Sequence, residues 1–162
     1  MLRDKSLIPL SHQHQHALAL CVRIDRASPI RDADLGAWQA EISQLFQTEI
    51  GIHFAAEEEV VFPAAQRFEE LVPLVDDLLA DHVVLREVLA HPSGLSATNL
   101  ATAAQRLSAH IRKEERQLFE RLQELLSPEQ LTLVGSQLDD ALKDAAQACI
   151  LPSEATKLRP AK

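Results

Sequence analysis

The feature that most constrains this fold is a series of long helix-forming stretches separated by short breaks that contain proline. Between the breaks the chain consists mainly of Ala, Leu, Glu, Gln and Arg, which are strong helix formers. We find no segment with the alternating pattern of a β-strand. The sequence therefore predicts five helices, whose ranges are 11–26, 34–62 with a bent extension through 68, 73–90, 96–126 and 128–148.

Four long helices with short connections predict an all-α fold. The simplest arrangement is an antiparallel up-down four-helix bundle with an additional C-terminal helix packed outside it. A chain of 162 residues has the size of a single domain. We expect one helical domain over residues 1–150 and a flexible, polar C-terminal tail over 151–162.

Seven histidines stand out in a sequence with no tyrosine and one tryptophan. Because a helix turns by about 100° per residue, the face of each side chain follows from its position. Each of the four bundle helices directs one histidine to its apolar face, and two of these histidines are followed four residues later by an inward glutamate. The inward residues are His14, His53, Glu57, His82, His110 and Glu114.

Four imidazoles and two carboxylates that converge in an apolar core require compensation, because a buried carboxylate without a partner is costly. Either a cation or strongly shifted protonation states can supply it. Histidine nitrogen together with carboxylate oxygen suits iron, manganese or zinc, and bridging carboxylates suit a pair of metal ions. Because chance does not easily place an inward histidine on each of four helices, the pattern favours a metal site in the bundle core.

Other polar residues have simpler interpretations. A lone core histidine is more often a hydrogen-bonded structural residue than a ligand, and His-x-x-x-Glu pairs also occur on solvated helix surfaces. We interpret His12, His16 and His91 as surface or loop residues, although either of the first two replaces His14 if the first helix is rotated. Cys21 faces the core and is predicted to be a small buried thiol rather than a ligand.

Two charged residues lie close to the inward faces of the second and third helices. Glu49 lies near the apolar face, and Arg86 follows His82 by one helical turn on the same face. We expect both to contact the ligands rather than the metal. Glu58 and Glu59 are predicted to point away from the core into solvent.

Four segments of the chain carry a resemblance to a known family. They are Leu-Ser-His-Gln-His-Gln-His-Ala-Leu-Ala-Leu at 10–20, His-Phe-Ala-Ala-Glu-Glu-Glu-Val-Val-Phe-Pro at 53–63, Leu-Ala-Asp-His-Val-Val-Leu-Arg at 79–86 and His-Ile-Arg-Lys-Glu-Glu-Arg-Gln-Leu-Phe at 110–119. In this order and spacing, over about residues 7–126, they resemble the hemerythrin-like proteins, which carry the HHE cation-binding domain. The resemblance implies a four-helix bundle with a non-haem di-iron centre, whose ligands map onto the six inward residues.

The sequence departs from the oxygen-carrying members of that family at two ligand positions. Those proteins have a second histidine on the third helix, where this chain has Arg86, and His-x4-Asp on the fourth, where this chain has His110 and Glu114. The smaller number of nitrogen ligands argues against simple reversible oxygen carriage. Arg86 either fills the space of the missing ligand or donates a hydrogen bond to a bridging carboxylate.

The resemblance leads to a functional hypothesis. One iron takes the histidines of the first two helices and the other takes those of the third and fourth, while Glu57 and Glu114 bridge them together with a water, hydroxide or oxo group. Each iron then keeps a position for a small molecule, and the apolar surroundings favour dioxygen or nitric oxide. The expected function is to bind or sense such a ligand. The alternatives are an enzyme-like redox role (peroxide or nitric oxide turnover, or oxidation of ferrous iron), metal storage and a regulatory module; no residue is assigned a catalytic role.

Composition argues against other classes of protein. The 24 acidic residues outnumber the 16 basic ones, and this net charge of −8 disfavours binding to nucleic acid or anionic membranes. We see no signal peptide and no stretch that approaches about 20 apolar residues, so a cytoplasmic protein with two reduced cysteines is expected. The expected partners are a small gas or peroxide, with a homodimer or a regulatory protein as further candidates.

Overall fold

The computed structural model describes residues 2–146, and this range contains no β-strand, which confirms the predicted all-α class. We call each of the four long helical segments of the bundle a rod. The first rod is the helix α1 (Ile8–Ala27). The second rod comprises α2 (Asp32–Leu45), the π-helical turn η1 (Phe46–Ile50), α3 (Gly51–Ala56), the π-helical turn η2 (Glu57–Val61) and α4 (Phe62–Ala65). The third rod is α5 (Val72–Ala90), which follows the short 3₁₀ turn η3 (Glu69–Leu71).

The fourth rod follows the 3₁₀ turn η4 (Pro92–Gly94) and comprises α6 (Ala97–Lys113), the π-helical turn η5 (Glu114–Leu118) and α7 (Phe119–Leu125). The last described helix is α8 (Pro128–Ala146). None of the helices between residues 2 and 146 is long and apolar enough to cross a membrane.

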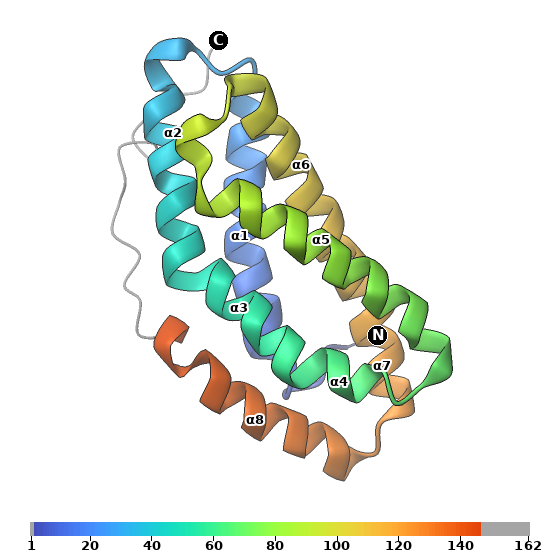
Figure 1. Ribbon diagram of the computed structural model, residues 1–162. Coiled ribbons are helices and arrows are strands. Elements are labelled where there is room, and N and C mark those ends of the chain that lie inside the picture. Colours follow the sequence, from blue (N-terminus) through green and yellow to red (C-terminus); the bar gives the residue numbers. More distant parts are fainter. Residues whose placement is uncertain (1, 147–162) are drawn as a thin grey trace.

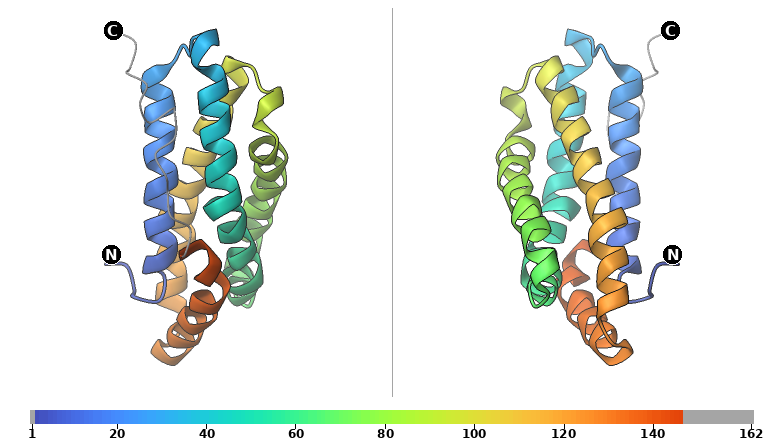
Figure 2. Two further views of the ribbon diagram at one scale, coloured as in Figure 1. Left: turned by 90° about the vertical axis from the view of Figure 1, so that its left-hand side faces the viewer. Right: turned by 90° about the vertical axis from the view of Figure 1, so that its right-hand side faces the viewer.

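The four rods lie side by side and alternate in direction along the chain (Figure 1). In that view α1 runs upward, the second rod runs downward, α5 runs up again, and α6 with α7 returns to the lower end. The two side views in Figure 2 show the same arrangement, with α8 placed across the lower end of the rods. The inward faces of the rods therefore meet along one common axis.

Two of the predicted long helices are interrupted by π-helical turns in the structure. Each was expected as an uninterrupted α-helix, but the second rod contains two π-helical turns and the fourth contains one. The first helix starts at Ile8 rather than at 11, because proline in the first helical turn sacrifices only an N–H that would have no partner anyway. Residues 147–148 of the predicted fifth helix and the predicted tail at 151–162 lie outside the described residues.

The buried apolar side chains form two clusters, one toward each end of the bundle. One cluster includes Leu10, Leu78 and Leu118, and the other includes Ala17 and Leu85. Along each rod, the inward histidines and glutamates lie between residues of the first cluster and residues of the second. The fold therefore holds a polar layer between two apolar layers, where water is excluded and charge interactions are strong.

The fifth helix, α8, covers the outside of the second rod. It packs along α3 and η2, and its buried side chains include Leu131, Val134 and Leu138. Gly135 lets α8 approach the N-terminal segment closely, because a Cβ at this position would lie 2.9 Å from both Cβ and Oγ of Ser6. The helix therefore belongs to the folded core although it lies outside the four-rod bundle.

The packing of α8 predicts a clear difference between two leucines on this helix. Leu138 is fully buried, so Leu138→Ala should lower the free energy of unfolding by about 2–5 kcal/mol. Leu133 is 60% exposed, so Leu133→Ala should change it by no more than about 0.5 kcal/mol. Urea unfolding followed by circular dichroism measures both, and equal effects would contradict the packing of α8.

Candidate metal centre

All six side chains that the sequence predicts to face inward are buried in the same region of the bundle. The most exposed of them, His53, keeps 4% of its surface accessible to solvent. They come from all four rods, and they are His14, His53, Glu57, His82, His110 and Glu114.

These residues form two groups that can each hold a metal ion, and the two groups share their carboxylates. One consists of His14 and His53 with Glu57 and Glu114, and the other of His82 and His110 with the same two glutamates. Within each group the donor atoms all lie within 4.8 Å of one another. This is the arrangement that a pair of cations bridged by two carboxylates requires.

The histidine rings direct their Nε2 atoms toward each other. Nε2 of His14 lies 2.9 Å from Nε2 of His53, and Nε2 of His82 lies 3.1 Å from Nε2 of His110. The nearest carboxylate contacts are of similar length, 3.1 Å from His53 to Glu57 and 3.2 Å from His110 to Glu114. Two neutral rings whose Nε2 atoms both carry lone pairs repel at such distances, so a shared proton or a cation is needed between them.

The two shared carboxylates lack hydrogen-bond partners. Both oxygens of Glu57 and both oxygens of Glu114 are buried and accept no hydrogen bond from the described residues. Their contacts with the histidines are close in distance but do not have hydrogen-bond geometry. Buried carboxylate oxygens without hydrogen bonds are costly, and coordination to a metal ion satisfies them, so the residues fit the proposed cation pair.

In the metal-free protein, protons compensate this negative charge. Burial by itself lowers the pKa of His14, but its contacts with Glu114 and Glu115 outweigh burial and raise this pKa to about 10. Burial alone raises the pKa of Glu57, yet the charge and contact of His53 hold it well below the usual value. The carboxylates are therefore ionised and the histidine carries a proton that a bound cation would displace.

Each histidine also faces an oxygen atom on its outer side. Nδ1 of His14 donates to Glu115 at 2.7 Å, and Nδ1 of His53 donates to the side-chain carbonyl of Gln13 at 2.7 Å. Burial raises the pKa of Glu115, but the hydrogen bonds from His14 and Ser11 outweigh it and lower this pKa to about 2.

The other two histidines have carboxylates on their outer side. Nδ1 of His82 donates to Glu58 at 2.8 Å, whereas Nδ1 of His110 lies 3.5 Å from Asp81 without a hydrogen bond. Such partners orient a histidine and fix which ring nitrogen faces the metal.

These outer partners were not predicted from the sequence, and the prediction for Glu58 was wrong. This residue was expected to point into solvent, but its side chain is only 30% exposed and accepts the hydrogen bond from His82. A signal was present in the spacing, because Glu58 and Glu115 each directly follow one of the shared glutamates. Helical periodicity turns such a residue by about 100° away from the inward glutamate that precedes it, and it cannot identify a partner on another helix.

Arg86 and Glu49 have different contacts from those expected. Arg86 donates to both oxygens of Glu58, at 2.6 and 3.1 Å, rather than to a bridging carboxylate. Glu49 is buried and accepts a hydrogen bond from Nδ1 of His16 at 3.0 Å. His16 is about half exposed, as expected for a surface residue, but it holds this buried carboxylate.

Two of the π-helical turns begin at the shared glutamates. The turn η2 starts at Glu57 and η5 starts at Glu114, each four residues after an inward histidine. A π-turn contains one more residue than an α-turn, which rotates the following side chains relative to the preceding ones. Such turns occur often at functional sites, and these two lie on the two rods that supply the carboxylates.

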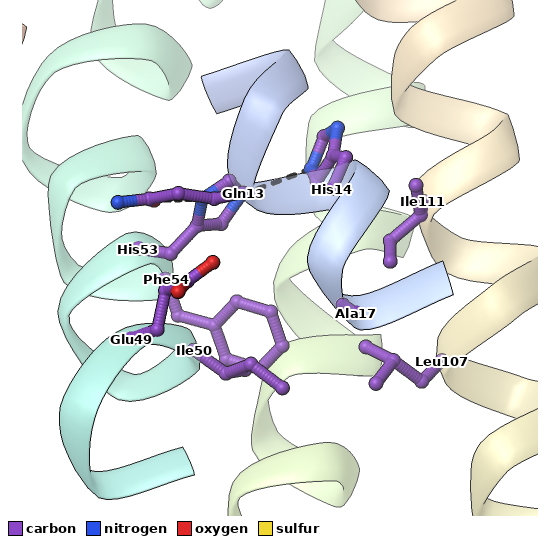
Figure 3. A pocket seen from close by; sticks show the side chains of 9 residues that line it. All are labelled: Gln13, His14, Ala17, Glu49, Ile50, His53, Phe54, Leu107 and Ile111. Atoms are coloured by element: carbon purple, nitrogen blue, oxygen red, sulfur yellow. Dashed lines mark hydrogen bonds between the residues drawn. The ribbon is translucent and has the colours of Figure 1, made fainter. Parts of the chain in front are cut away.

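A small cavity lies beside the first pair of histidines (Figure 3). The centre of a water-sized molecule can move within about 10 Å³ of this cavity, so the cavity has room for about one such molecule. The accessible surface inside it is apolar. The residues that line it come from α1, the second rod and α6, and they are Gln13, His14, Ala17, Glu49, Ile50, His53, Phe54, Leu107 and Ile111.

Cys21 is buried, as expected, and takes part in neither group of metal donors. Burial raises the pKa of its thiol to about 12, although the nearby charge of Arg112 opposes this effect. The thiol therefore stays protonated at neutral pH and is a poor metal ligand and nucleophile.

Comparison with known proteins gives one match. A family model described as Hemerythrin HHE cation binding domain matches residues 9–122, which is more than half of the 162-residue chain. The matched range contains all six inward residues and ends before α8. Neither the curated proteins nor the solved structures that were compared with the chain include a match.

The geometry predicts that divalent metal ions stabilise the folded chain. Adding Zn²⁺ or Co²⁺ to the metal-free protein should raise its unfolding temperature, because an ion at about 100 times its Kd contributes about 2.7 kcal/mol. The near-isosteric Glu57→Gln and the larger change His53→Ala should both remove most of this stabilisation. His12→Ala, at an exposed position of α1, is the control and should keep it. Equal stabilisation of all four proteins would place the metal elsewhere.

The raised pKa of Cys21 predicts slow alkylation in the folded state. In a Cys149→Ser background, iodoacetamide at pH 8 should modify the folded protein much more slowly than the urea-unfolded protein, because only the thiolate reacts. The rate should rise with pH toward the pKa of about 12. Mass spectrometry over time measures both rates, and similar rates in the two states would rule out a buried thiol.

Proposed function

Because the chain belongs to the hemerythrin HHE cation-binding domain family, we propose that it holds two non-haem iron ions and binds or senses a small diatomic molecule, O₂ or NO. The observation that carries this proposal is that Glu57 and Glu114 belong to both groups of metal donors. A single ion in either group would use only one pair of histidines, whereas two ions use all four. Manganese and zinc suit the same donor atoms, so the choice of iron rests on the family.

The number of protein donors supports a centre that accepts small ligands. Each group offers two histidine nitrogens and two carboxylates, so an ion that takes more than four ligands keeps positions for molecules from outside the chain. When bound, the two irons would supply reversible electron transfer and affinity for O₂ or NO. The chain's own residues hold the ions, orient the histidines through Nδ1 and exclude water from the layer between the two apolar clusters.

The cavity beside His14 and His53 supports a diatomic ligand rather than a larger substrate. It has room for about one water-sized molecule, and the surface that it presents is apolar. O₂ and NO are small and weakly polar, so they enter such a space without the loss of hydrogen bonds that a polar substrate would suffer. Glu49, one of the residues that line the cavity, keeps its carboxylate in a hydrogen bond with Nδ1 of His16.

Iron analysis tests the proposed centre directly. Protein purified aerobically, or loaded with ferrous iron and then oxidised, should contain about two irons per chain and show the near-ultraviolet absorption of a bridged iron pair. His53→Ala and His110→Ala should each lose iron. A folded protein that takes up no iron, or one iron that neither substitution affects, would contradict the proposal.

Rapid mixing of the reduced protein with O₂, NO or peroxide tests the ligand. A stable adduct with O₂ or NO supports binding or sensing. Repeated consumption of NO or peroxide would instead support the enzyme-like alternative and contradict a binding role.

Two substitutions in the cavity should change ligand binding in opposite directions. Ala17→Leu fills the cavity, and an increase of about 1.4 kcal/mol in the barrier would slow ligand entry about tenfold. Leu107→Ala enlarges the cavity and should speed entry. Both should keep their iron, and Ala33→Leu at an exposed position of α2 is the control. Unchanged rates in both cavity variants would show that the ligand does not use this cavity.

A further inference from the structure

One side of His82 is flanked by a carboxylate and a phenyl ring that contact the same arginine. Glu58 accepts from Nδ1 of His82 at 2.8 Å and from two nitrogens of Arg86 at 2.6 and 3.1 Å. The ring of Phe54 stacks on His82 with a centroid distance of 3.9 Å and an interplanar angle of 17°. The guanidinium of Arg86 lies over Phe54, 5.7 Å from its centroid. Arg86 therefore contacts both groups that flank His82, the carboxylate of Glu58 and the ring of Phe54.

The same four-part arrangement surrounds His14, but its arginine comes from the N-terminal segment. Glu115 accepts from Nδ1 of His14 at 2.7 Å and from Arg3 at 2.6 Å. Phe119 stacks on His14 with a centroid distance of 5.6 Å and an interplanar angle of 13°. The guanidinium of Arg3 lies over Phe119, 5.2 Å from its centroid.

Further contacts fix the position of Arg3 although it precedes the first helix. It donates to the backbone carbonyl of Glu115 at 2.8 Å and to the side chain of Gln123 at 3.0 Å. The backbone N–H of Asp4 donates to the same Gln123 oxygen at 2.9 Å. Arg3 lies outside residues 9–122, the range that the family model matches.

We propose that Arg3 and Arg86 are positioning residues of the metal centre, one for each pair of histidines. Each arginine fixes the carboxylate and the phenyl ring that flank one histidine. The carboxylate keeps the proton of the neutral ring on Nδ1, which leaves Nε2 for the metal, and the phenyl ring sets the plane of the imidazole. Arg3 thereby links the N-terminal segment before α1 to the groups that surround His14. This inference rests on the proposed function, because it takes the histidines to be metal ligands.

A purely structural role for these arginines predicts that their removal lowers the stability of the fold, whereas a positioning role predicts that it weakens metal binding. The side chains of Arg3 and Arg86 are 18% and 36% exposed, and partly exposed ion pairs contribute little to stability. We therefore expect their removal to leave the midpoint of urea unfolding nearly unchanged but to weaken metal binding. Loss of a residue that orients a metal ligand typically lowers metal affinity by about 10–100-fold.

The test uses Arg3→Gln and Arg86→Gln in the full chain, with Arg121→Gln as the control. Arg121 also binds two carboxylates, those of Glu70 and Glu124, but at an exposed place away from the histidines. Zn²⁺ affinity is measured by competition with a chelating dye. Each test variant should bind one of the two ions about tenfold more weakly than the wild type, the control should match the wild type, and Arg3→Lys should recover part of the loss.

Side-chain ¹⁵N NMR of the histidines identifies which ring is affected. Arg3→Gln should shift the signals of His14 and leave those of His82, and Arg86→Gln should do the reverse, in both the metal-free and the Zn²⁺-loaded protein. Unchanged signals in both test variants, or a loss of affinity equal to that of the control, would overturn the inference. Wild-type protein that takes up no metal would instead contradict the proposed function, and the spectra of the metal-free protein would still report whether each arginine orients its histidine.

Discussion

Two ionised carboxylates lie in the middle of an apolar bundle, and the rest of the structure depends on how their charge is compensated. Glu57 and Glu114 are fully buried and lack hydrogen bonds from the described residues. The four surrounding histidines are the nearest groups that can carry positive charge or share it with a metal ion. In a low-dielectric layer an uncompensated carboxylate would favour unfolding or protonation, so the six residues act as one unit.

The apolar clusters on either side give this unit its chemical character. They exclude water along the bundle axis, and this strengthens charge interactions within the layer. A small cavity with an apolar accessible surface lies beside His14 and His53. Under the function that we propose, a cavity of this size accepts a ligand of two atoms more readily than a substrate that needs a binding groove.

The outer partners of the histidines link the centre to the surface through repeated arrangements. His14 and His82 are each flanked by an arginine, a glutamate and a phenylalanine. In both cases the glutamate directly follows a shared carboxylate in the sequence. The arginines themselves come from unrelated places, α5 and the segment before α1. Different parts of the chain thus orient the two rings whose Nε2 atoms face the polar layer.

The sequence by itself determined the all-α fold and the set of residues that face inward. Helix-forming composition and proline breaks define the rods, and the 3.6-residue period places His53 and Glu57, or His110 and Glu114, on one face. Only the tertiary structure decided what meets these residues from other rods. Arg3 and Glu115 are 112 positions apart, and Glu58 accepts hydrogen bonds from His82 and Arg86 on α5, 24 and 28 positions away. Periodicity determines the direction of a side chain on its own helix, whereas its partners depend on how separate helices pack.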